Sequence, residues 1–279
     1  MTDNTQHPDP HEDLRVLINQ IEGHLKAQRD LFGERAFVAK STVKKKESPV
    51  QIEPEPPVQL KSQAKVPVRA AANVPVVPST VVSAAPVSDE PWVKADSLIS
   101  LNDQICNCLK CPLGKTRTKF VFGVGNPNAD IMFIGEGPGA DEDRIGEPFV
   151  GRAGQLLTKI MEAIQLKREE VYIANIVKCR PPENRVPLPE EMEMCTPYLL
   201  RQIALVRPKF IVALGRTSAQ YLLKTTSSLS AMREQVHEYQ GAKLIVTFHP
   251  AALLRNPNWK RPTWEDMKKL RSLYDESKA

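Results

Sequence analysis

Apolar residues recur first at helical spacing, then lose this periodicity in a proline-rich stretch, and finally return as strand-like runs. Between residues 10 and 33 they fall on one helical face: Leu14, Leu17, Ile18, Ile21 and Leu25. This spacing predicts one amphipathic helix that ends near Gly33. Residues 39–95 contain nine prolines and no glycine, which is typical of a semi-extended linker with polyproline character. We therefore expect an amphipathic helix within 1–38, a disordered linker over 39–96 and a folded domain over 97–279.

Four β-rich apolar runs alternate with helix-like segments in the C-terminal region. The runs are ADIMFIG (129–135), VYIANIVK (171–178), KFIVALG (209–215) and AKLIVTF (242–248). The helix-like segments are 153–165, 189–206, 216–223 and 262–275. Near-continuous apolar strands separated by helices indicate an α/β domain, in which helices cover both faces of a parallel sheet.

The segments that follow these strands carry the candidate chemistry, because ligands of such sheets bind beyond the carboxyl ends of the strands. In GEGPGADED, Gly135, Gly137 and Gly139 either form a tight turn or let the backbone approach a ligand. The acidic residues among them disfavour a phosphate loop. Asn175 lies within an apolar strand, where its amide either bonds to a neighbouring loop or recognises a base.

The segment HPAALLRNP follows the last apolar run and begins with His249. A histidine after a strand is most often simply exposed or hydrogen-bonded. Leu253 and Leu254 stand beside Arg255 in what we expect to be a proline-bounded loop without an obvious core. An apolar wedge next to a basic residue suits insertion into a stack of bases.

Three of the five cysteines lie in CNCLKC, residues 106–111, and two more follow at 179 and 195. Cys108 and Cys111 form a C-x-x-C pair, and with Cys179 and Cys195 they suit either an iron–sulfur cluster or a structural zinc ion. Buried free thiols are the alternative, which would explain Cys195 but not a C-x-x-C pair on a polar loop. Cys106 is the surplus cysteine.

Charge and hydropathy narrow the class of protein. Residues 1–98 carry 12 Lys and Arg against 13 Asp and Glu, whereas residues 99–279 carry 26 against 20. The basic C-terminal region permits a nucleic-acid partner. Proline or charge breaks every long apolar run, and the polar, acidic N-terminus is unlike a secretory signal. We therefore expect a cytoplasmic monomer with no membrane contact, in which cysteines bind metal rather than form disulfides.

Several blocks together resemble the family 4 uracil-DNA glycosylases, the iron–sulfur branch of that superfamily. The resemblance runs from about Leu101 to about Leu273, roughly two-thirds of the chain, and rests on these blocks in family order: CLKCPLGKTRTKFVFGVGNPNADIMFIGEGPG, EPFVGRAGQLL, NIVKCRPPENRVP, LGRTSAQYLL and HPAALLR. It implies a three-layer sandwich with a central four-stranded parallel sheet. It also implies a [4Fe–4S] cluster, structural rather than redox-cycling, on Cys108, Cys111, Cys179 and Cys195.

The resemblance implies excision of uracil from uracil-containing DNA, leaving an abasic site for base excision repair. Phe149 would stack on the flipped base, Asn175 would bond to its Watson–Crick edge, and His249 would stabilise charge on the departing base. Glu136 would border the sugar and orient water or stabilise the sugar cation.

The same resemblance places Gly135 and Gly137 against the substrate. Leu253, with Leu254 beside it, would fill the vacated stack, and Arg255 would hold phosphates. Better-known relatives carry an aspartate and a tyrosine where this chain has Gly137 and Gly139, and we expect Glu142 to help organise the pocket instead.

Three alternatives stay open at the level of sequence. The segment QRDLF, Gln28 to Phe32, resembles the peptide with which bacterial repair proteins bind the sliding clamp; the alternative is the frayed end of an amphipathic helix. A non-catalytic DNA-binding protein on the same fold is the competing functional class. Zinc is the competing metal.

Overall fold

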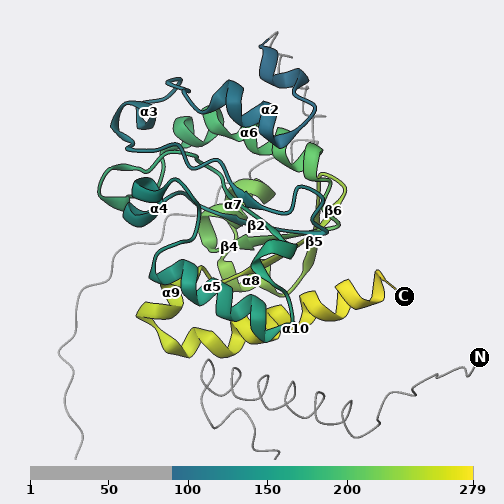
Figure 1. Cartoon of the computed structure of the whole chain (residues 1–279). Coiled ribbons are helices and arrows are strands. Elements are labelled where there is room, and N and C mark those ends of the chain that lie inside the picture. The colour runs from purple at the N-terminus through teal and green to yellow at the C-terminus, as the bar shows by residue number, and fades with distance from the viewer. Residues whose placement is uncertain (1–89, 279) are drawn as a thin grey trace, which may run out of the picture. The chain divides into compact units, whose positions relative to one another are not determined.

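A six-stranded mixed sheet of order β1-β3-β2-β4-β6-β5 lies at the centre of the computed structural model, which describes residues 90–278 (Figure 1). The four central strands are parallel: β3 (Tyr172–Asn175), β2 (Ile131–Gly135), β4 (Phe210–Leu214) and β6 (Ala242–Thr247). These are the four predicted strands, and the prediction of a central parallel sheet is confirmed.

Two antiparallel edge strands complete the sheet: β1 (Val124–Gly125) and β5 (Val236–Tyr239). The sequence did not indicate either of them. β1 has only two residues, and β5 alternates between exposed and half-buried positions instead of forming an apolar run. Such a pattern is typical of an edge strand, which is less buried than a central one.

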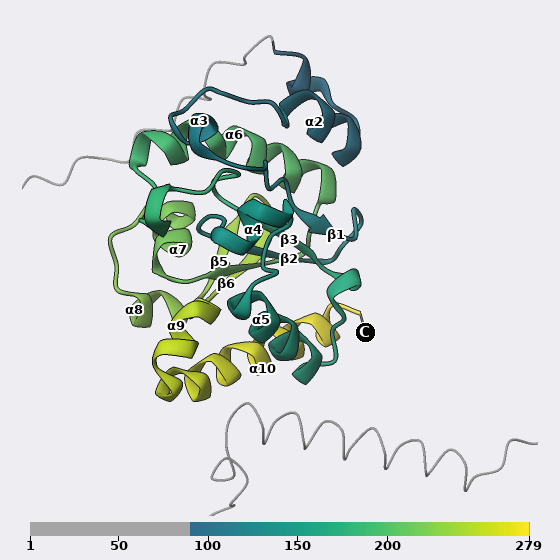
Figure 2. The ribbon, with the colours of Figure 1, turned by 60° about the vertical axis from the view of Figure 1, so that its left-hand side comes forward.

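Helices cover both faces of the sheet, so the domain has three layers (Figures 1 and 2). Four helices agree with prediction: α5 (Arg152–Ala163), α6 (Pro189–Val206), α7 (Arg216–Leu223) and α10 (Lys260–Glu276). Five short helices were not predicted: α2 (Leu98–Ile105), α3 (Leu113–Thr116), α4 (Ala140–Ile145), α8 (Leu229–Arg233) and α9 (Pro250–Arg255). Short 3₁₀ turns lie at Pro91–Lys94, Arg168–Glu170, Pro182–Asn184 and Pro257–Trp259.

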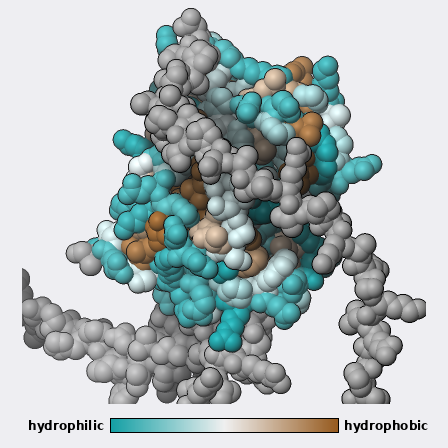
Figure 3. Space-filling view, turned by 180° about the vertical axis from the view of Figure 1, so that it is seen from behind, coloured by the Kyte–Doolittle hydropathy of each residue, from teal (hydrophilic) through white to brown (hydrophobic). Residues whose placement is uncertain are grey.

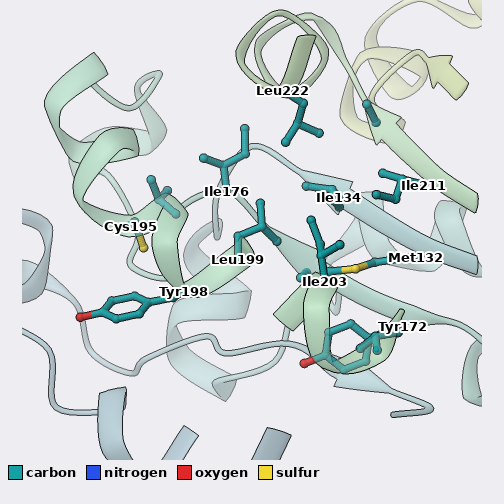
Figure 4. Packing of buried hydrophobic residues seen from close by; sticks show 14 of the residues in the cluster. Met132, Ile134, Tyr172, Ile176, Cys195, Tyr198, Leu199, Ile203, Ile211 and Leu222 are labelled. Carbon is teal, nitrogen blue, oxygen red and sulfur yellow. The ribbon is translucent and has the colours of Figure 1, made fainter. Parts of the chain in front are cut away.

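Alternation along the strands divides the apolar side chains between two cores. Phe133 and Val212 point to the face covered by α5, α9 and α10. Met132 and Ile211, one residue earlier on each strand, point to the face covered by α2, α6 and α7, where Leu199 and Ile203 of α6 meet them (Figure 4). Burial on both faces explains why the central strands read as continuous apolar runs.

The domain begins slightly before the predicted boundary at residue 97. Trp92 and Ala95 are buried in the α6-side core, and the ring of Trp92 meets that of Tyr198 edge to face at 4.8 Å. The predicted N-terminal helix, most of the linker and the clamp-like segment Gln28–Phe32 lie outside the described residues. On the face shown in Figure 3, hydrophobic residues reach the surface as separate patches among hydrophilic ones. Within residues 90–278, every helix is too short or too polar to cross a membrane.

Candidate functional site

A cavity of about 810 Å³ opens at the carboxyl ends of the four parallel strands. The segments after β2, β3, β4 and β6 all contribute to its walls, as the topological rule for such sheets requires. Eight of the residues singled out in the sequence line it: Glu136, Gly137, Gly139, Glu142, Phe149, Asn175, His249 and Arg255. The fold therefore brings together residues that are up to 119 positions apart in the chain, from 136 to 255.

Asn175, the last residue of β3, is 1% exposed and lines the cavity. Its Oδ1 is buried without a hydrogen-bond partner among the described residues. Gly135 lies directly opposite on β2, and a Cβ there would overlap Asn175 Oδ1 and the ring of Phe149. Gly135 is absent from the cavity wall itself; its role is to leave room for the two side chains that form the wall.

Phe149 is held in a fixed position by its neighbours, although its backbone has the unusual φ of 55°. The Glu142 carboxylate accepts hydrogen bonds from the backbone N–H groups of Val150 (2.9 Å) and Gly151 (3.0 Å), directly after Phe149. Arg168 donates to the carbonyl of Pro148, directly before it. Glu142 also accepts from Gly139 N–H at 3.1 Å. This geometry agrees with the expectation that Glu142 organises the pocket.

His249 is the N-cap of α9, and its Nδ1 accepts a hydrogen bond from the N–H of Ala251 at 3.2 Å. Because Nδ1 is an acceptor, the proton of the neutral ring lies on Nε2. Burial, and secondarily the charge of Arg255, lowers the pKa of His249 to about 4. Gly215 lets α7 approach closely, since a Cβ there would come within 2.9 Å of His249 Cβ. The imidazole ring lies 5.5 Å from the Phe149 ring, centroid to centroid.

Glu136 and Gly137 follow β2 and line the same cavity. The carbonyl of Glu136 accepts a hydrogen bond from Val177 N–H at 3.2 Å, which fixes the backbone where the chain leaves the sheet. A Cβ on Gly137 would come within 2.7 Å of Val177 Cγ2. Gly137 therefore permits close packing of this turn against the segment after β3.

The expected loop around Leu253 is the short helix α9, and this corrects the choice of wedge residue. Successive residues of a helix point about 100° apart, so the two leucines cannot share one environment. Leu253 is 1% exposed and lies in the core between the sheet, α5 and α10, whereas Leu254 is 41% exposed. Leu254 and Arg255 can therefore contact a partner, whereas the buried Leu253 cannot.

Four cysteines from distant segments gather on the α6 side of the sheet. Cys179 and Cys195 are buried in that core, and Cys108 and Cys111 pack against it. Burial raises the pKa of Cys179 to about 11 and that of Cys195 to about 12, and both thiols lie within electrostatic reach of Cys111. Cys106 stands apart, since its thiol donates to the carbonyl of Asp103 at 3.6 Å.

Hydrogen-bond donors surround these thiols. Tyr198 donates its hydroxyl to Cys108 Sγ at 3.3 Å, Arg117 donates to Cys179 Sγ at 3.4 Å, and the N–H of Lys178 donates to Cys195 Sγ at 3.3 Å. Donors of this kind stabilise thiolates that ligate a metal.

The chemistry of the donor set tests which group fits. Four cysteine sulfurs that gather from distant segments and accept hydrogen bonds from an arginine, a tyrosine and a backbone N–H fit a cysteine-bound metal group. Both a [4Fe–4S] cluster and a zinc ion use four such ligands.

Sequence comparison identifies the family. The model of the uracil DNA glycosylase superfamily matches residues 122–268. The chain belongs to this superfamily. The match covers the cavity residues and two of the four gathered cysteines, Cys179 and Cys195.

Individual relatives fall in the predicted branch. The type-4 uracil-DNA glycosylase of Archaeoglobus fulgidus is 46% identical over 186 residues, 64% of this chain and 94% of the relative. Those of Sulfurisphaera tokodaii and Thermotoga maritima are 47% and 44% identical, over 64% and 65% of this chain and 85% and 96% of the relatives. The resemblance to family 4 and the predicted uracil-DNA glycosylase activity are thereby confirmed.

Sequence reasoning missed three groups that shape this site. Lys178 is fully buried, and burial lowers its pKa to about 8. The sequence indicated this only through the presence of a lysine in the apolar run VYIANIVK. Arg168 fixes the loop before Phe149, and nothing in its local sequence suggests that contact. Trp259 lines the cavity beside Phe248. In the sequence, its only indication was an aromatic residue shortly after a proline.

Proposed function

We propose that the cavity binds a uracil flipped out of DNA and that its side chains hydrolyse the N-glycosidic bond. The observation that carries the proposal is the buried Oδ1 of Asn175 in the cavity wall, which has no hydrogen-bond partner within residues 90–278. An unpaired buried acceptor costs about 1–3 kcal/mol. Uracil presents an N3–H donor beside the O4 acceptor, so the Asn175 amide accepts with Oδ1 and donates with Nδ2. Cytosine presents the reverse pattern.

Phe149 supplies the surface on which the flipped base stacks. Its ring is 6% exposed and its loop is held on both sides by Glu142 and Arg168. Such a ring loses little freedom on binding, and an offset stack with a base compensates for part of the stacking lost in DNA.

His249 stabilises the leaving group. As the C1′–N1 bond breaks, its electron pair passes to the base, and the negative charge spreads to O2. The neutral imidazole donates its Nε2–H toward that oxygen, and its low pKa keeps the ring neutral at physiological pH.

Glu136 acts on the sugar side of the bond. Its carboxylate stabilises the positive charge that develops at C1′ and orients a water molecule toward that atom. The water oxygen bonds to C1′, and its proton passes to Glu136 and then to solvent. The uracil anion takes up a proton from solvent, so the products are free uracil and an abasic site.

Leu254 and Arg255 serve the flipping step. Leu254 is the exposed apolar residue on α9, the helix that begins directly after His249, and it fills the space that the base leaves. Arg255 lines the cavity and binds phosphate, which makes affinity fall steeply with salt.

Cys108, Cys111, Cys179 and Cys195 are proposed to hold a [4Fe–4S] cluster, supported by their gathering and by the donors around them. The cluster, when bound, supplies a structural link and takes no part in bond breaking. It joins the segment after β3 to α6 and to the α2–α3 region. Purified protein with about four irons per chain and a brown colour would support the cluster; zinc without iron would overturn it.

For the residues before 90, which the structure does not describe, we propose that Gln28–Phe32 binds the sliding clamp and that the proline-rich segment from residue 39 onward tethers it to the folded domain. We also propose a cytoplasmic monomer. Exchanging Leu31 and Phe32 for alanine should abolish clamp binding in a pull-down with purified clamp; unchanged binding would end the idea.

The decisive test is single-turnover excision of uracil from a U·G duplex by His249→Ala. Losing one donor to a developing anion typically costs about 10²–10³ in rate. His237, a half-buried histidine of β5 that bonds the carbonyl of Met232 at 2.8 Å, is the matched control. We expect His237→Ala to keep the full rate. Equal rates for wild type and His249→Ala would refute the assignment.

A further inference from the structure

One part of the cavity is not used by the residues that would hold uracil. Its walls there are Phe248, Trp259, Arg255 and the Ser228–Ser230 segment at the start of α8. Phe248 directly precedes His249, so this part of the wall begins where the proposed uracil site ends. With about 810 Å³ in total, the cavity can take a second planar group as well as one pyrimidine base.

The aromatic side chains here form a stack. The rings of Phe248 and Trp259 lie 5.1 Å apart, centroid to centroid, and are inclined by only 13°. The Arg233 guanidinium carbon lies 4.6 Å from the Phe248 ring centroid, within cation–π range. Trp259 retains 38% exposure, which is unusual for a large aromatic residue in this domain.

A buried network fixes the stack before any ligand arrives. Arg233 donates to both carboxylate oxygens of Asp266, at 2.7 and 2.9 Å, and to the carbonyl of Pro262 at 2.8 Å. Thr247, at the end of β6, donates to Asp266 as well, at 2.7 Å. The arginine therefore cannot swing away from Phe248 without breaking several hydrogen bonds.

The backbone of Trp259 is equally restrained. Its N–H donates to the carbonyl of Asn256 at 3.2 Å, and its carbonyl accepts from Thr263 Oγ1 at 2.8 Å. The uracil chemistry proposed above has no use for this network. A rigid aromatic face beside a basic residue is the arrangement with which proteins bind single-stranded nucleic acid.

We propose that the Phe248–Trp259 stack is a platform for an unpaired nucleobase adjacent to the target uracil on the same strand. This rests on the proposed function, because a strand that delivers uracil to His249 carries its neighbour past Phe248. Any base can stack there, so the platform has no sequence preference. In a duplex, the neighbouring base stays paired with its complement and cannot reach the platform. The platform therefore favours uracil in single-stranded or opened DNA.

The first experiment measures kcat/KM for Trp259→Leu on single-stranded and on duplex uracil substrates. Stacking on an aromatic side chain contributes about 1–3 kcal/mol per base, so we expect a loss of roughly 5- to 150-fold on the single strand and less than twofold on the duplex. Trp259→Phe, which keeps a stacking ring, should recover most of the single-strand rate. Equal losses on the two substrates would overturn the proposal.

The second experiment uses single-stranded substrates in which the bases flanking uracil are replaced by abasic residues. Wild type should lose about as much rate on these as Trp259→Leu loses on normal DNA. The variant should lose nothing further, since its partner ring is already gone. Independent losses that multiply would show that the flanking bases and Trp259 do not interact. The effect of the flanking bases is measured on wild type alone, so this experiment still tests the proposal where Trp259→Leu folds poorly.

Binding without catalysis separates this inference from the proposed function. The chain has three tryptophans, Trp92, Trp259 and Trp264, so Trp92→Phe/Trp264→Phe leaves Trp259 as the only tryptophan fluorophore. A uracil-free single-stranded oligonucleotide should quench that fluorescence, and duplex of the same sequence should quench it far less. Quenching without uracil excision would overturn only the proposed function. Excision without quenching would overturn only the platform.

Discussion

Lowering the pH from 8 to 5 should leave the rate of uracil excision almost unchanged, because His249 stays neutral over this range. The reaction as proposed needs the neutral ring, whose Nε2–H faces the departing base while Nδ1 accepts from Ala251. An ordinary histidine would take up a proton within this range. Burial and the nearby charge of Arg255 lower the pKa of His249 and so prevent protonation here, and the charge of Glu142 offsets this lowering only in part.

The pKa shift sets the expected magnitude. A fall from 6.5 to about 4 disfavours the charged ring by about 3 kcal/mol, at 1.36 kcal/mol per unit. At pH 5.5 an unperturbed imidazole would be roughly 90% protonated, whereas His249 would be only about 3% protonated. The acid limb of the rate profile should therefore lie near pH 4 to 5 instead of near 6.5.

The same shift makes the stability of the fold depend on pH. Below pH 6.5 the unfolded chain binds a proton on this histidine, but the folded chain does not until about pH 4. The unfolded state then binds more protons, so the free energy of unfolding falls as the pH falls through this window. Circular dichroism at each pH is needed to separate loss of folded enzyme from loss of rate.

The assay is a series of single-turnover excision rates on a uracil oligonucleotide, with the His249 titration followed by NMR in the same buffers. His237→Ala removes the other histidine of the described domain as a control. A loss of rate near pH 6.5 in both wild type and His237→Ala, matched by an NMR titration of His249 at that pH, would refute the argument that burial keeps the ring neutral.

Five further substitutions test other contacts. Glu142→Gln weakens three backbone hydrogen bonds and should lower the free energy of unfolding by about 2 kcal/mol, measured in urea, and raise KM, since charged hydrogen bonds contribute about 1.5–3 kcal/mol each. Gly135→Ala should lower kcat/KM at least about tenfold, because its methyl group meets Asn175 and Phe149. Leu253→Ala should cost about 2–5 kcal/mol in urea unfolding, whereas Leu254→Ala should spare stability and slow excision from duplex DNA. Cys195→Ser should lower the iron content per chain, and unchanged iron would remove Cys195 from the proposed ligands.

Contacts that follow from local pattern were predictable from the sequence. The four central strands are apolar along their whole length because both of their faces are buried, and the rule that ligands bind at their carboxyl ends located the cavity. Edge strand β5 was missed, because VHEY has one half-buried face and one exposed face. Helix α9 was missed as well, although a capping histidine followed by proline is a helix-start signal.

Contacts between distant segments were not predictable in this way. No local pattern shows that Arg233 binds Asp266, or that Glu142 accepts from the loop around Phe149, since each pair meets only once the sheet has formed. The error over Leu253 has the same origin. Adjacent leucines look equivalent in a loop, but a helix directs one of them into the core and the other to solvent.

Lys178 explains why the cysteines and the uracil site belong to one structural unit. It is fully buried; its Nζ donates to the carbonyl of Asn175 at 2.9 Å and to Gln202 Oε1 at 2.5 Å, and its N–H donates to Cys195 Sγ. A buried ammonium group costs several kcal/mol unless negative charge lies nearby, and the thiols of Cys195 and Cys179 are the groups whose charge favours it. In the proposed cluster these sulfurs would be thiolates and would carry that charge. The contact that positions Asn175 therefore reaches back through Lys178 to the gathered cysteines as well as to the pocket.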